Sequence, residues 1–275
     1  MLGQRIHIAS SAGAQIPLDL YVSEVSLEID ENIQRPSVVI CPGGGYEFLS
    51  SREAEPVALS FVASGFNAFV VWYRVAPARY PLPQQDAAAA VAYVRAHAKE
   101  LHCNPGQIAI LGFSAGGHLA GSLGTLWQKA GLWQEMGLTP DDVRPNAMAL
   151  CYPVVTGGEY AHRGSFLALT GTEDQEAHKR YSVDGWVTPD CPPAFLWHTF
   201  EDTCVPVQNS LLMARALADN GVLTELHVFP HGEHGASLCN EQTSGIKNPQ
   251  LVLADNACWT KMAQRFLRQS MAQTC

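Results

Sequence analysis

Short apolar segments alternate along the chain with segments in which apolar residues recur at helical spacing. The continuous apolar runs predict buried strands, because helices that cover both faces of a sheet leave no polar face. The periodic segments predict helices with one buried side. The predicted strands lie at 5–8, 18–22, 36–41, 68–73, 108–113, 147–151, 194–199 and 224–229. The predicted helices lie at 56–63, 81–101, 208–220 and 256–269, and another follows residue 114.

The order of these elements predicts the fold. Strands that alternate with helices indicate a doubly wound α/β domain with a mainly parallel sheet. Two connections, 127–146 and 156–193, are long for simple loops. We expect each of them to carry short helices and to lie over the functional site as a rim or partial cap. The whole chain, residues 1–275, is predicted to form one such domain.

The most specific local pattern is a serine between two glycines, directly after a predicted strand. The strand at 108–113 leads into Gly112, Ser114 and Gly116, and a helix of small residues follows. A serine raised on so tight a turn needs neighbours without a Cβ, and the first amides of the next helix point at the place where an oxyanion would form. The pattern predicts a nucleophile elbow. The alternative is a helix-entry turn that Ser114 merely caps.

A serine hydroxyl becomes a nucleophile only with a base nearby and a third group that orients the base. Acidic residues and histidines follow two consecutive strands of the predicted sheet, at the carboxyl ends where sites of such sheets form. Asp202 competes with Glu201 as the acid, and His234 competes with His231 as the base. We favour Asp202, because it opens an Asp-Thr-Cys-Val-Pro phrase, and His234, because the small residue Gly235 follows it.

Six motifs spread over most of the chain together resemble one known family. They are Cys-Pro-Gly-Gly-Gly-Tyr at 41–46, Tyr-Arg-Val-Ala-Pro at 73–77, Asp-Ala-Ala-Ala-Ala-Val at 86–91, Gly-Phe-Ser-Ala-Gly-Gly-His-Leu at 112–119, Asp-Thr-Cys-Val-Pro at 202–206 and His-Gly at 234–235. With these motifs the chain resembles the α/β-hydrolase fold esterase/lipase superfamily. Within it, the chain is similar to acetyl xylan esterase-like carbohydrate esterases related to the hormone-sensitive lipase group.

The resemblance implies a Ser-His-Asp mechanism. Ser114 would be the nucleophile, His234 the general base and later acid, and Asp202 the carboxylate that orients the imidazole. The backbone amides implied for the oxyanion hole are those of Gly44, Gly45 and Ala115. The family commonly has a histidine where this chain has Pro42, which leaves open what braces the glycine loop. The resemblance implies no metal and no organic cofactor.

The net charge and the distribution of cysteines limit which binding partners and which cellular compartment we expect. The net charge of -9 argues against nucleic acid and anionic membranes as partners. The N-terminus lacks the apolar core of a signal peptide, and no run of about eighteen apolar residues could span a membrane. The eight cysteines are scattered without metal-ligand spacing, which suits a reducing compartment. We therefore expect a cytoplasmic protein, while a secreted protein trimmed of its leader would look the same.

Several single residues are expected to pack rather than react. Cys41, Cys151 and Cys204 lie near predicted strand ends and are expected to be small buried or half-buried residues. His118, in the helix after Ser114, and His198, in a strand, are expected to be packed and hydrogen-bonded.

Aromatic residues in loops and the absence of a large apolar lid indicate which class of substrate the site would accept. Tyr46 and Trp186 are candidates for a rim that would stack on sugar rings or aryl groups, and the alternative for each is ordinary packing. The resemblance implies a small-molecule ester or acetylated oligosaccharide substrate, chiefly acetyl groups on carbohydrate such as acetylated xylan oligosaccharides. An amidase, a formamidase or an aryl (feruloyl) esterase would use the same triad.

Two other classes fit the chain less well. A peptidase of the prolyl-oligopeptidase type carries a large extra domain, for which this chain has no room. A non-catalytic small-molecule binding protein on this fold would be expected to have lost a member of the triad, and Ser114, Asp202 and His234 are all present.

Overall fold

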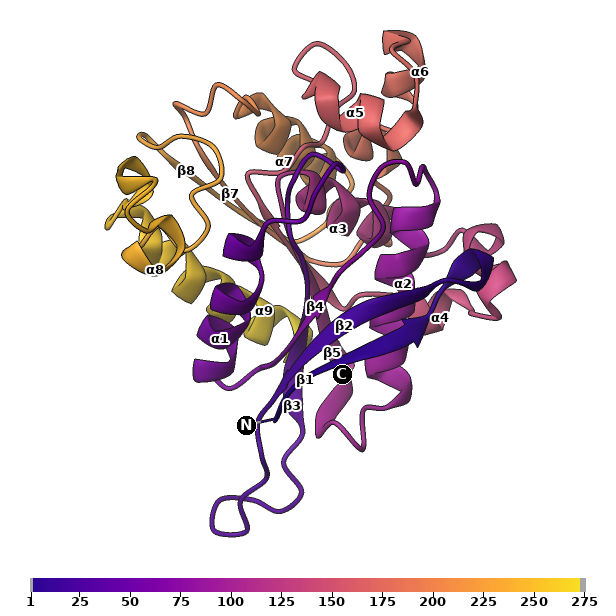
Figure 1. Cartoon of the computed structure of the whole chain (residues 1–275), viewed down its shortest axis with the longest axis vertical. Coiled ribbons are helices and arrows are strands. Elements are labelled where there is room, and N and C mark those ends of the chain that lie inside the picture. The colour runs from indigo at the N-terminus through magenta and orange to yellow at the C-terminus, as the bar shows by residue number, and fades with distance from the viewer. Residues whose placement is uncertain (1, 273–275) are drawn as a thin grey trace.

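The computed structural model describes residues 2–272, and in that part of the chain eight strands form one sheet (Figure 1). The strands are β1 (Leu2–Ala9), β2 (Gln15–Val22), β3 (Arg35–Cys41), β4 (Asn67–Val71), β5 (Cys103–Phe113), β6 (Ala147–Cys151), β7 (Ala194–Thr199) and β8 (Thr224–Phe229). Their order in the sheet is β1-β2-β4-β3-β5-β6-β7-β8. β2 is antiparallel to both β1 and β4, and every other pair is parallel. The prediction of a mainly parallel sheet is confirmed.

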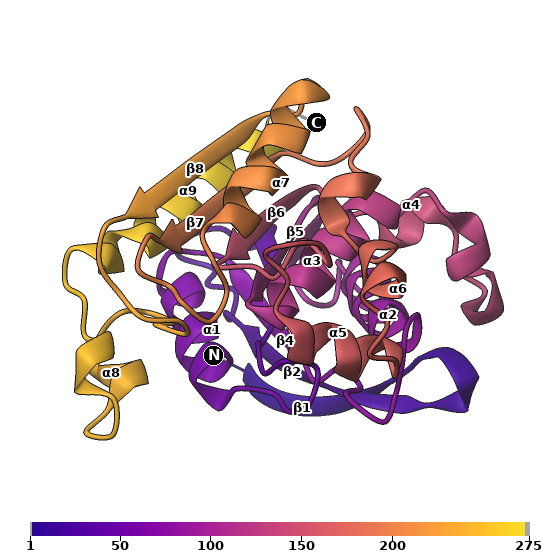
Figure 2. The ribbon, with the colours of Figure 1, turned by 90° about the horizontal axis from the view of Figure 1, so that it is seen from above.

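Helices cover both faces of the sheet. They are α1 (Glu55–Ala63), α2 (Leu82–Ala96), α3 (Ala115–Leu126), α4 (Pro140–Val143), α5 (Arg163–Thr170), α6 (Gln175–Lys179), α7 (Gln208–Asp219), α8 (Glu241–Ser244) and α9 (Trp259–Ala272). Short 3₁₀ turns are η1 (Ser11–Gly13), η2 (Ser51–Glu53), η3 (Ala130–Leu132), η4 (Gln134–Met136), η5 (Val183–Trp186), η6 (Pro249–Leu251) and η7 (Asn256–Cys258). α1 and α9 pack on one face, and α2, α3 and α7 pack on the other (Figure 2).

The central strands contain continuous apolar runs because each of their faces is buried. In β3, Val38 and Ile40 pack into the core beneath α1 and α9, whereas Val39 and Cys41 pack into the core beneath α2 and α3. All four side chains are inaccessible to solvent. This two-sided burial is the physical reason why a continuous apolar run, and not an alternating one, marks these strands.

The two long connections lie at opposite ends of the sheet. β5 ends at Phe113 and α3 then runs back, so segment 127–146 begins at the amino ends of the strands. That segment carries η3, η4 and α4 and packs beside α2, with Trp133 fully buried. Segment 156–193 follows the carboxyl end of β6 and carries α5 and α6, which lie beyond that edge of the sheet (Figure 1).

Within residues 2–272, no helix combines the length and the apolar character needed to cross a bilayer.

Candidate active site

Ser114 occupies the turn between β5 and α3 in a conformation that few residues adopt. Its φ is 52° and its ψ is -119°, which places a non-glycine residue in the positive-φ region. The surrounding backbone holds it there, since its amide donates to the carbonyl of Cys151 at 3.0 Å and its carbonyl accepts from Val154 at 3.0 Å. The turn therefore has the strained geometry expected of a nucleophile elbow.

The two glycines that flank Ser114 are required by close backbone contacts. A Cβ added to Gly112 would lie 2.0 Å from the carbonyl oxygen of Gly116. A Cβ added to Gly116 would lie 2.1 Å from the carbonyl oxygen of Cys41. Both distances are far inside van der Waals contact, and both contacts are with backbone, which cannot rotate away. β3, β5 and α3 therefore approach one another as closely as they do only because these positions lack side chains.

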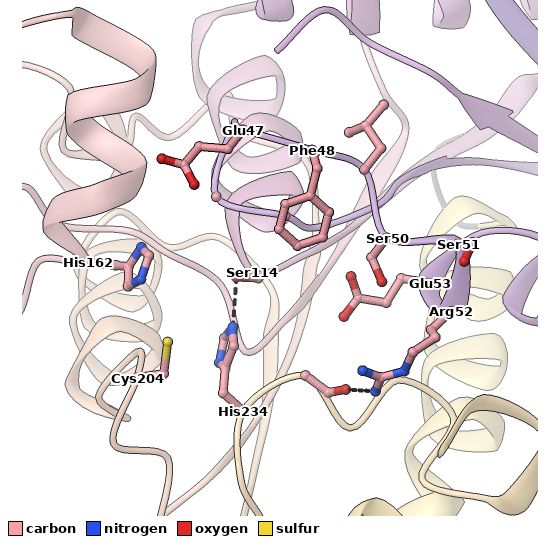
Figure 3. Close-up of a pocket in the computed structure, with 14 residues that line it drawn as sticks. Glu47, Phe48, Ser50, Ser51, Arg52, Glu53, Ser114, His162, Cys204 and His234 are labelled. Carbon is pink, nitrogen blue, oxygen red and sulfur yellow. Dashed lines mark hydrogen bonds between the residues drawn. The ribbon is translucent and has the colours of Figure 1, made fainter. Parts of the chain in front are cut away.

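The structure brings Ser114, His234 and Asp202 into one hydrogen-bonded chain, of which Figure 3 shows the contact between Ser114 and His234. His234 Nε2 lies 2.8 Å from Ser114 Oγ, and His234 Nδ1 lies 2.6 Å from Asp202 Oδ2. Because an ionised carboxylate can only accept, Nδ1 carries the proton and Nε2 is free to accept from the serine hydroxyl. The arrangement is suited to removing the serine proton during nucleophilic attack.

The competing residues pair with each other on the surface. His231 Nδ1 lies 2.9 Å from Glu201 Oε1, and the His231 side chain is 76% exposed. Neither residue reaches Ser114, so the geometry favours the sequence-based choice of Asp202 over Glu201 and of His234 over His231.

Asp202 is fully buried and yet held in its charged form. Its Oδ1 accepts from the amides of Cys204 at 3.0 Å and Val205 at 2.9 Å. His198 Nε2 approaches its Oδ2 at 3.3 Å. Burial by itself would raise the pKa of this carboxyl, but the hydrogen bonds from His198 and His234 outweigh that cost and hold the pKa well below its usual range. The acid therefore stays ionised and can orient His234.

His198 is packed as expected, and its contacts add to the site. Its Nδ1 lies 2.8 Å from Ser210 Oγ, and its Nε2 lies 2.8 Å from the carbonyl oxygen of Val205. A carbonyl accepts only, so Nε2 bears the proton that also faces Asp202. His198 thus places a second N–H beside the Asp202 oxygen that His234 also contacts.

The glycine loop after β3 has free amides at the wall of the pocket that contains Ser114. Gly44 and Gly45 line this pocket, and nothing in residues 2–272 accepts a hydrogen bond from either amide. Ala115 is the first residue of α3, where an amide has no partner within the helix. These three amides are the ones that the resemblance implies for an oxyanion hole, and their availability fits that role.

Other residues brace the loop where Pro42 replaces the histidine of the related family. Tyr73 donates its hydroxyl to the carbonyl of Pro42 at 2.6 Å. The amide of Gly43 donates to Glu53 Oε2 at 2.8 Å. Side chains therefore hold both polar groups of the peptide that joins Pro42 to Gly43, directly before Gly44.

Glu53 is a residue of the site that the sequence did not reveal. Its side chain is buried, and its Oε1 accepts a 2.6 Å hydrogen bond from the Tyr152 hydroxyl. That hydroxyl in turn accepts from the amide of Ser237 at 2.9 Å. Nothing in the local sequence marks this carboxylate, because it lies in a short 3₁₀ turn and its partner is 99 positions away.

The pocket around Ser114 has a volume of about 540 Å³. It is lined by residues 44–45 and 47–53, and by Ser114, His162, Cys204, His234 and Gly235. None of segment 127–146 lines it, whereas segment 156–193 contributes His162. The prediction that segment 127–146 lies over the site is therefore wrong. The reason is that α3 carries the chain away from the carboxyl ends of the strands before that segment begins.

The two aromatic residues predicted at the rim lie elsewhere. The Tyr46 side chain is 1% exposed and its hydroxyl lies 2.9 Å from Nδ1 of the buried His118. Trp186 lines a separate pocket with Tyr80 and Tyr181. The prediction that Tyr46 and Trp186 form the rim of the site is therefore wrong, and both residues pack elsewhere. His118 is packed, as predicted.

The cysteines that the structure describes form no disulfide, and the burial predicted for one of them is wrong. In the part of the chain that the structure describes, all seven cysteines are unpaired, and Cys275 lies outside it. Cys204 was expected to be buried or half-buried, but it is exposed at the pocket wall because it lies in the turn after β7 rather than in the strand. No set of three or more His, Cys, Asp or Glu side chains within residues 2–272 is arranged to hold a metal ion.

The sheet order and the strained serine after β5 are those of the α/β-hydrolase class, to which the solved structures that resemble this one also belong. Within this class the chain belongs to the family described as BD-FAE, whose model matches residues 18–217.

Three individual proteins show which activities occur among its relatives. An endo-1,4-β-xylanase B from Butyrivibrio fibrisolvens is 33% identical over 78% of this chain and 34% of its own length. An acetylxylan esterase from Xylanibacter ruminicola is 32% identical over 75% of this chain and 42% of its own. The chain therefore spans less than half the length of these two relatives. The crystal structure of an acetyl ester-xyloside bifunctional hydrolase from Caldicellulosiruptor lactoaceticus has a TM-score of 0.78 and 38% identity, and covers 93% of this chain and 88% of that one.

Proposed function

We propose that this protein is a serine carboxylesterase that removes short acyl groups, chiefly acetyl, from carbohydrate esters such as acetylated xylan oligosaccharides. The observation that carries the proposal is the 2.8 Å contact between Ser114 Oγ and His234 Nε2, with Asp202 behind the imidazole. The named activities of the acetylxylan esterase and the bifunctional hydrolase support the choice of an acetylated sugar.

The proposed reaction proceeds through an acyl-enzyme. Ser114 Oγ attacks the ester carbonyl while His234 Nε2 takes the hydroxyl proton. The tetrahedral intermediate collapses, the bond to the alcohol oxygen breaks, and the alcohol leaves with the proton from His234. Water then attacks the acyl-serine by the same route, releasing the acid and restoring Ser114. Asp202 holds the imidazole in the tautomer that accepts at Nε2 and stabilises the imidazolium that forms in each step.

The oxyanion is assigned to the amides of Gly44, Gly45 and Ala115. Gly44 and Gly45 line the pocket and their amides have no acceptor among residues 2–272, and Ala115 opens α3. Preorganised donors of this kind favour the charge that develops on the carbonyl oxygen, and loss of one donor typically costs about 10²–10³ in kcat. The hydrogen bonds to the peptide between Pro42 and Gly43 fix the start of the loop before substrate arrives.

The pocket supports a short acyl chain. Its large hydrocarbon side chains are the neighbouring residues Phe48 and Leu49, in the loop that follows the glycines. Contact with two such side chains suits an acetyl group, which has little apolar surface to bury.

The test is hydrolysis of p-nitrophenyl acetate, butyrate and octanoate, beside acetylated xylooligosaccharides, by the wild type and by Ser114→Ala. The proposal expects the acetate to be cleaved faster than the octanoate, release of acetate from the oligosaccharides, and no turnover by the variant. Parallel assays with formamide and feruloyl substrates distinguish the amidase and aryl-esterase alternatives. Full activity in Ser114→Ala, or an inert wild type, would reject the mechanism and favour a binding protein.

A further inference from the structure

One wall of the active-site pocket carries a histidine whose hydrogen bonds determine where its proton lies. His162 precedes α5, and the backbone amide of Ser165 donates to its Nδ1 at 3.3 Å. The Ser165 hydroxyl lies 2.8 Å from the same nitrogen. A backbone N–H can only donate, so Nδ1 must offer a lone pair and the proton of the neutral ring is on Nε2.

The proton on Nε2 of His162 is available to a ligand. His162 lines the pocket with Ser114 and His234 (Figure 3). No residue in the range 2–272 accepts a hydrogen bond from Nε2. The atom is not buried, so solvent in the pocket reaches it. Burial lowers the pKa of His162, and the nearby His234 lowers it further. The ring is therefore a neutral donor at pH 7, held in one orientation by α5.

A carboxylate on the opposite loop faces the same space. Glu47 lies directly after the glycine loop, and its side chain extends toward the His162 side of the pocket (Figure 3). Its amide donates to the carbonyl of Gly44 at 3.0 Å, which ties its position to the loop proposed to hold the oxyanion. No side chain or backbone donor among residues 2–272 pairs with its carboxylate. Its charge nevertheless acts on His162, since it raises the pKa of that ring against the larger effect of burial.

A fixed N–H donor and an unpaired carboxylate, on two loops beside the nucleophile, form a complementary pair for a polyhydroxyl ligand. The carboxylate accepts from a hydroxyl group, and the N–H donates to a neighbouring hydroxyl or ring oxygen. We propose that His162 and Glu47 form the subsite for the sugar that carries the ester, so that the enzyme selects esters of polyhydroxylated alcohols over alkyl or aryl esters of the same acid. This inference rests on the proposed esterase function, because it assigns the alcohol side of that reaction.

The proposal predicts a change in selectivity rather than a general loss. Glu47→Gln keeps the size of an exposed side chain and removes its charge. His162→Asn keeps an acceptor for the Ser165 amide, since asparagine is a good N-cap. The shorter side chain no longer places an N–H donor where Nε2 of His162 offers one to the ligand. The measured quantity is kcat/KM for acetylated xylobiose divided by kcat/KM for p-nitrophenyl acetate. We expect this ratio to fall about tenfold in each variant, the usual effect of losing one ligand hydrogen bond with a charged or fixed partner.

A matched control and a binding measurement complete the test. Glu135→Gln changes an exposed carboxylate in η4, outside the pocket, and should leave the ratio at the wild-type value. Unacetylated xylobiose should inhibit hydrolysis of p-nitrophenyl acetate competitively, with a weaker inhibition constant in Glu47→Gln and His162→Asn. A ratio and an inhibition constant that match the wild type in both variants would overturn the subsite while leaving the esterase in place. A wild type that cleaves neither substrate would overturn the esterase proposal, and the subsite with it.

Discussion

The Tyr152 hydroxyl donates a 2.6 Å hydrogen bond to the buried carboxylate of Glu53, and this pair joins two parts of the site. The other oxygen of Glu53 holds the amide of Gly43, at the start of the glycine loop. The Tyr152 oxygen holds the amide of Ser237, three residues after His234, and the tyrosine ring meets the His234 ring edge-on at 5.1 Å. One side-chain pair therefore sets the position of the glycine loop relative to the imidazole.

Glu53→Gln tests this positioning role. Glutamine offers one oxygen in place of two, so either Gly43 or Tyr152 would meet an amide NH₂ group instead of an acceptor. We expect kcat for p-nitrophenyl acetate to fall about 10- to 100-fold with a smaller change in KM, because a donor misplaced by a fraction of an ångström loses most of its effect on the transition state. Steady-state kinetics measure both constants.

Tyr152→Phe is the companion variant. It removes one hydroxyl and leaves the buried Ser237 amide and one Glu53 oxygen unpaired, at a cost of about 1–3 kcal/mol in unfolding free energy. A lowered kcat in both variants would support a shared positioning role. If Glu53→Gln lowered the melting temperature but kept the wild-type kcat, the pair would be structural only.

The elements that could be predicted from the sequence are those whose cause is local. Burial on both faces forces a continuous apolar run such as that of β3, and the close approach of α3 to β5 forces glycine at 112 and 116. The location of the site could also be predicted, because the carboxyl ends of parallel strands lie at one edge of the sheet and sites form there.

The contacts that escaped prediction depend on the path of the chain in space. Glu53 and Tyr152 are 99 positions apart, and neither lies in a recognisable motif. His162 reaches the pocket because α5 follows the carboxyl end of β6, whereas Trp133 lies outside the pocket because its segment follows the far end of α3. Length and aromatic content alone could not distinguish these two connections.

Gly116→Ala should strongly destabilise the folded protein. The added methyl group would lie 2.1 Å from the carbonyl oxygen of Cys41, so β3 and α3 would have to separate. We expect the unfolding free energy to fall by about 3 kcal/mol or more, the upper range for overpacking against backbone. Urea unfolding followed by circular dichroism gives the value. Gly131→Ala is the matched control, because no atom lies within 4 Å of the added methyl group, and a large effect there would show that the method, not the contact, is responsible.

His118 should make the protein less stable as the pH falls. It is buried, its Nε2 donates to the carbonyl of Tyr181 at 2.8 Å, and burial lowers its pKa to about 4 from an ordinary value of 6.5. Because the unfolded chain binds the proton more readily than the folded one, the stabilisation is complete above pH 6.5 and is lost progressively toward pH 4. The difference corresponds to about 3 kcal/mol.

Urea unfolding of the wild type and His118→Gln at several pH values isolates this group from the others that titrate in the same range. Glutamine can accept from Tyr46 and donate to Tyr181, but it does not ionise. We expect the variant to lose less stability than the wild type between pH 7 and pH 4.5. Parallel curves for the two proteins would show that His118 is not the titrating group.

Cys204 should be the site of inactivation by thiol reagents. It is exposed at the pocket wall, whereas Cys41, Cys103, Cys151 and Cys239 are buried. Burial of part of the side chain raises the pKa of its thiol above 9.0, and the Asp202 carboxylate raises it further, so the rate of modification should still be rising at pH 9. A bulky maleimide should abolish hydrolysis of p-nitrophenyl acetate, and Cys204→Ser should resist the reagent. Equal inactivation of Cys204→Ser would place the reactive thiol elsewhere, with the half-buried Cys258 the next to test.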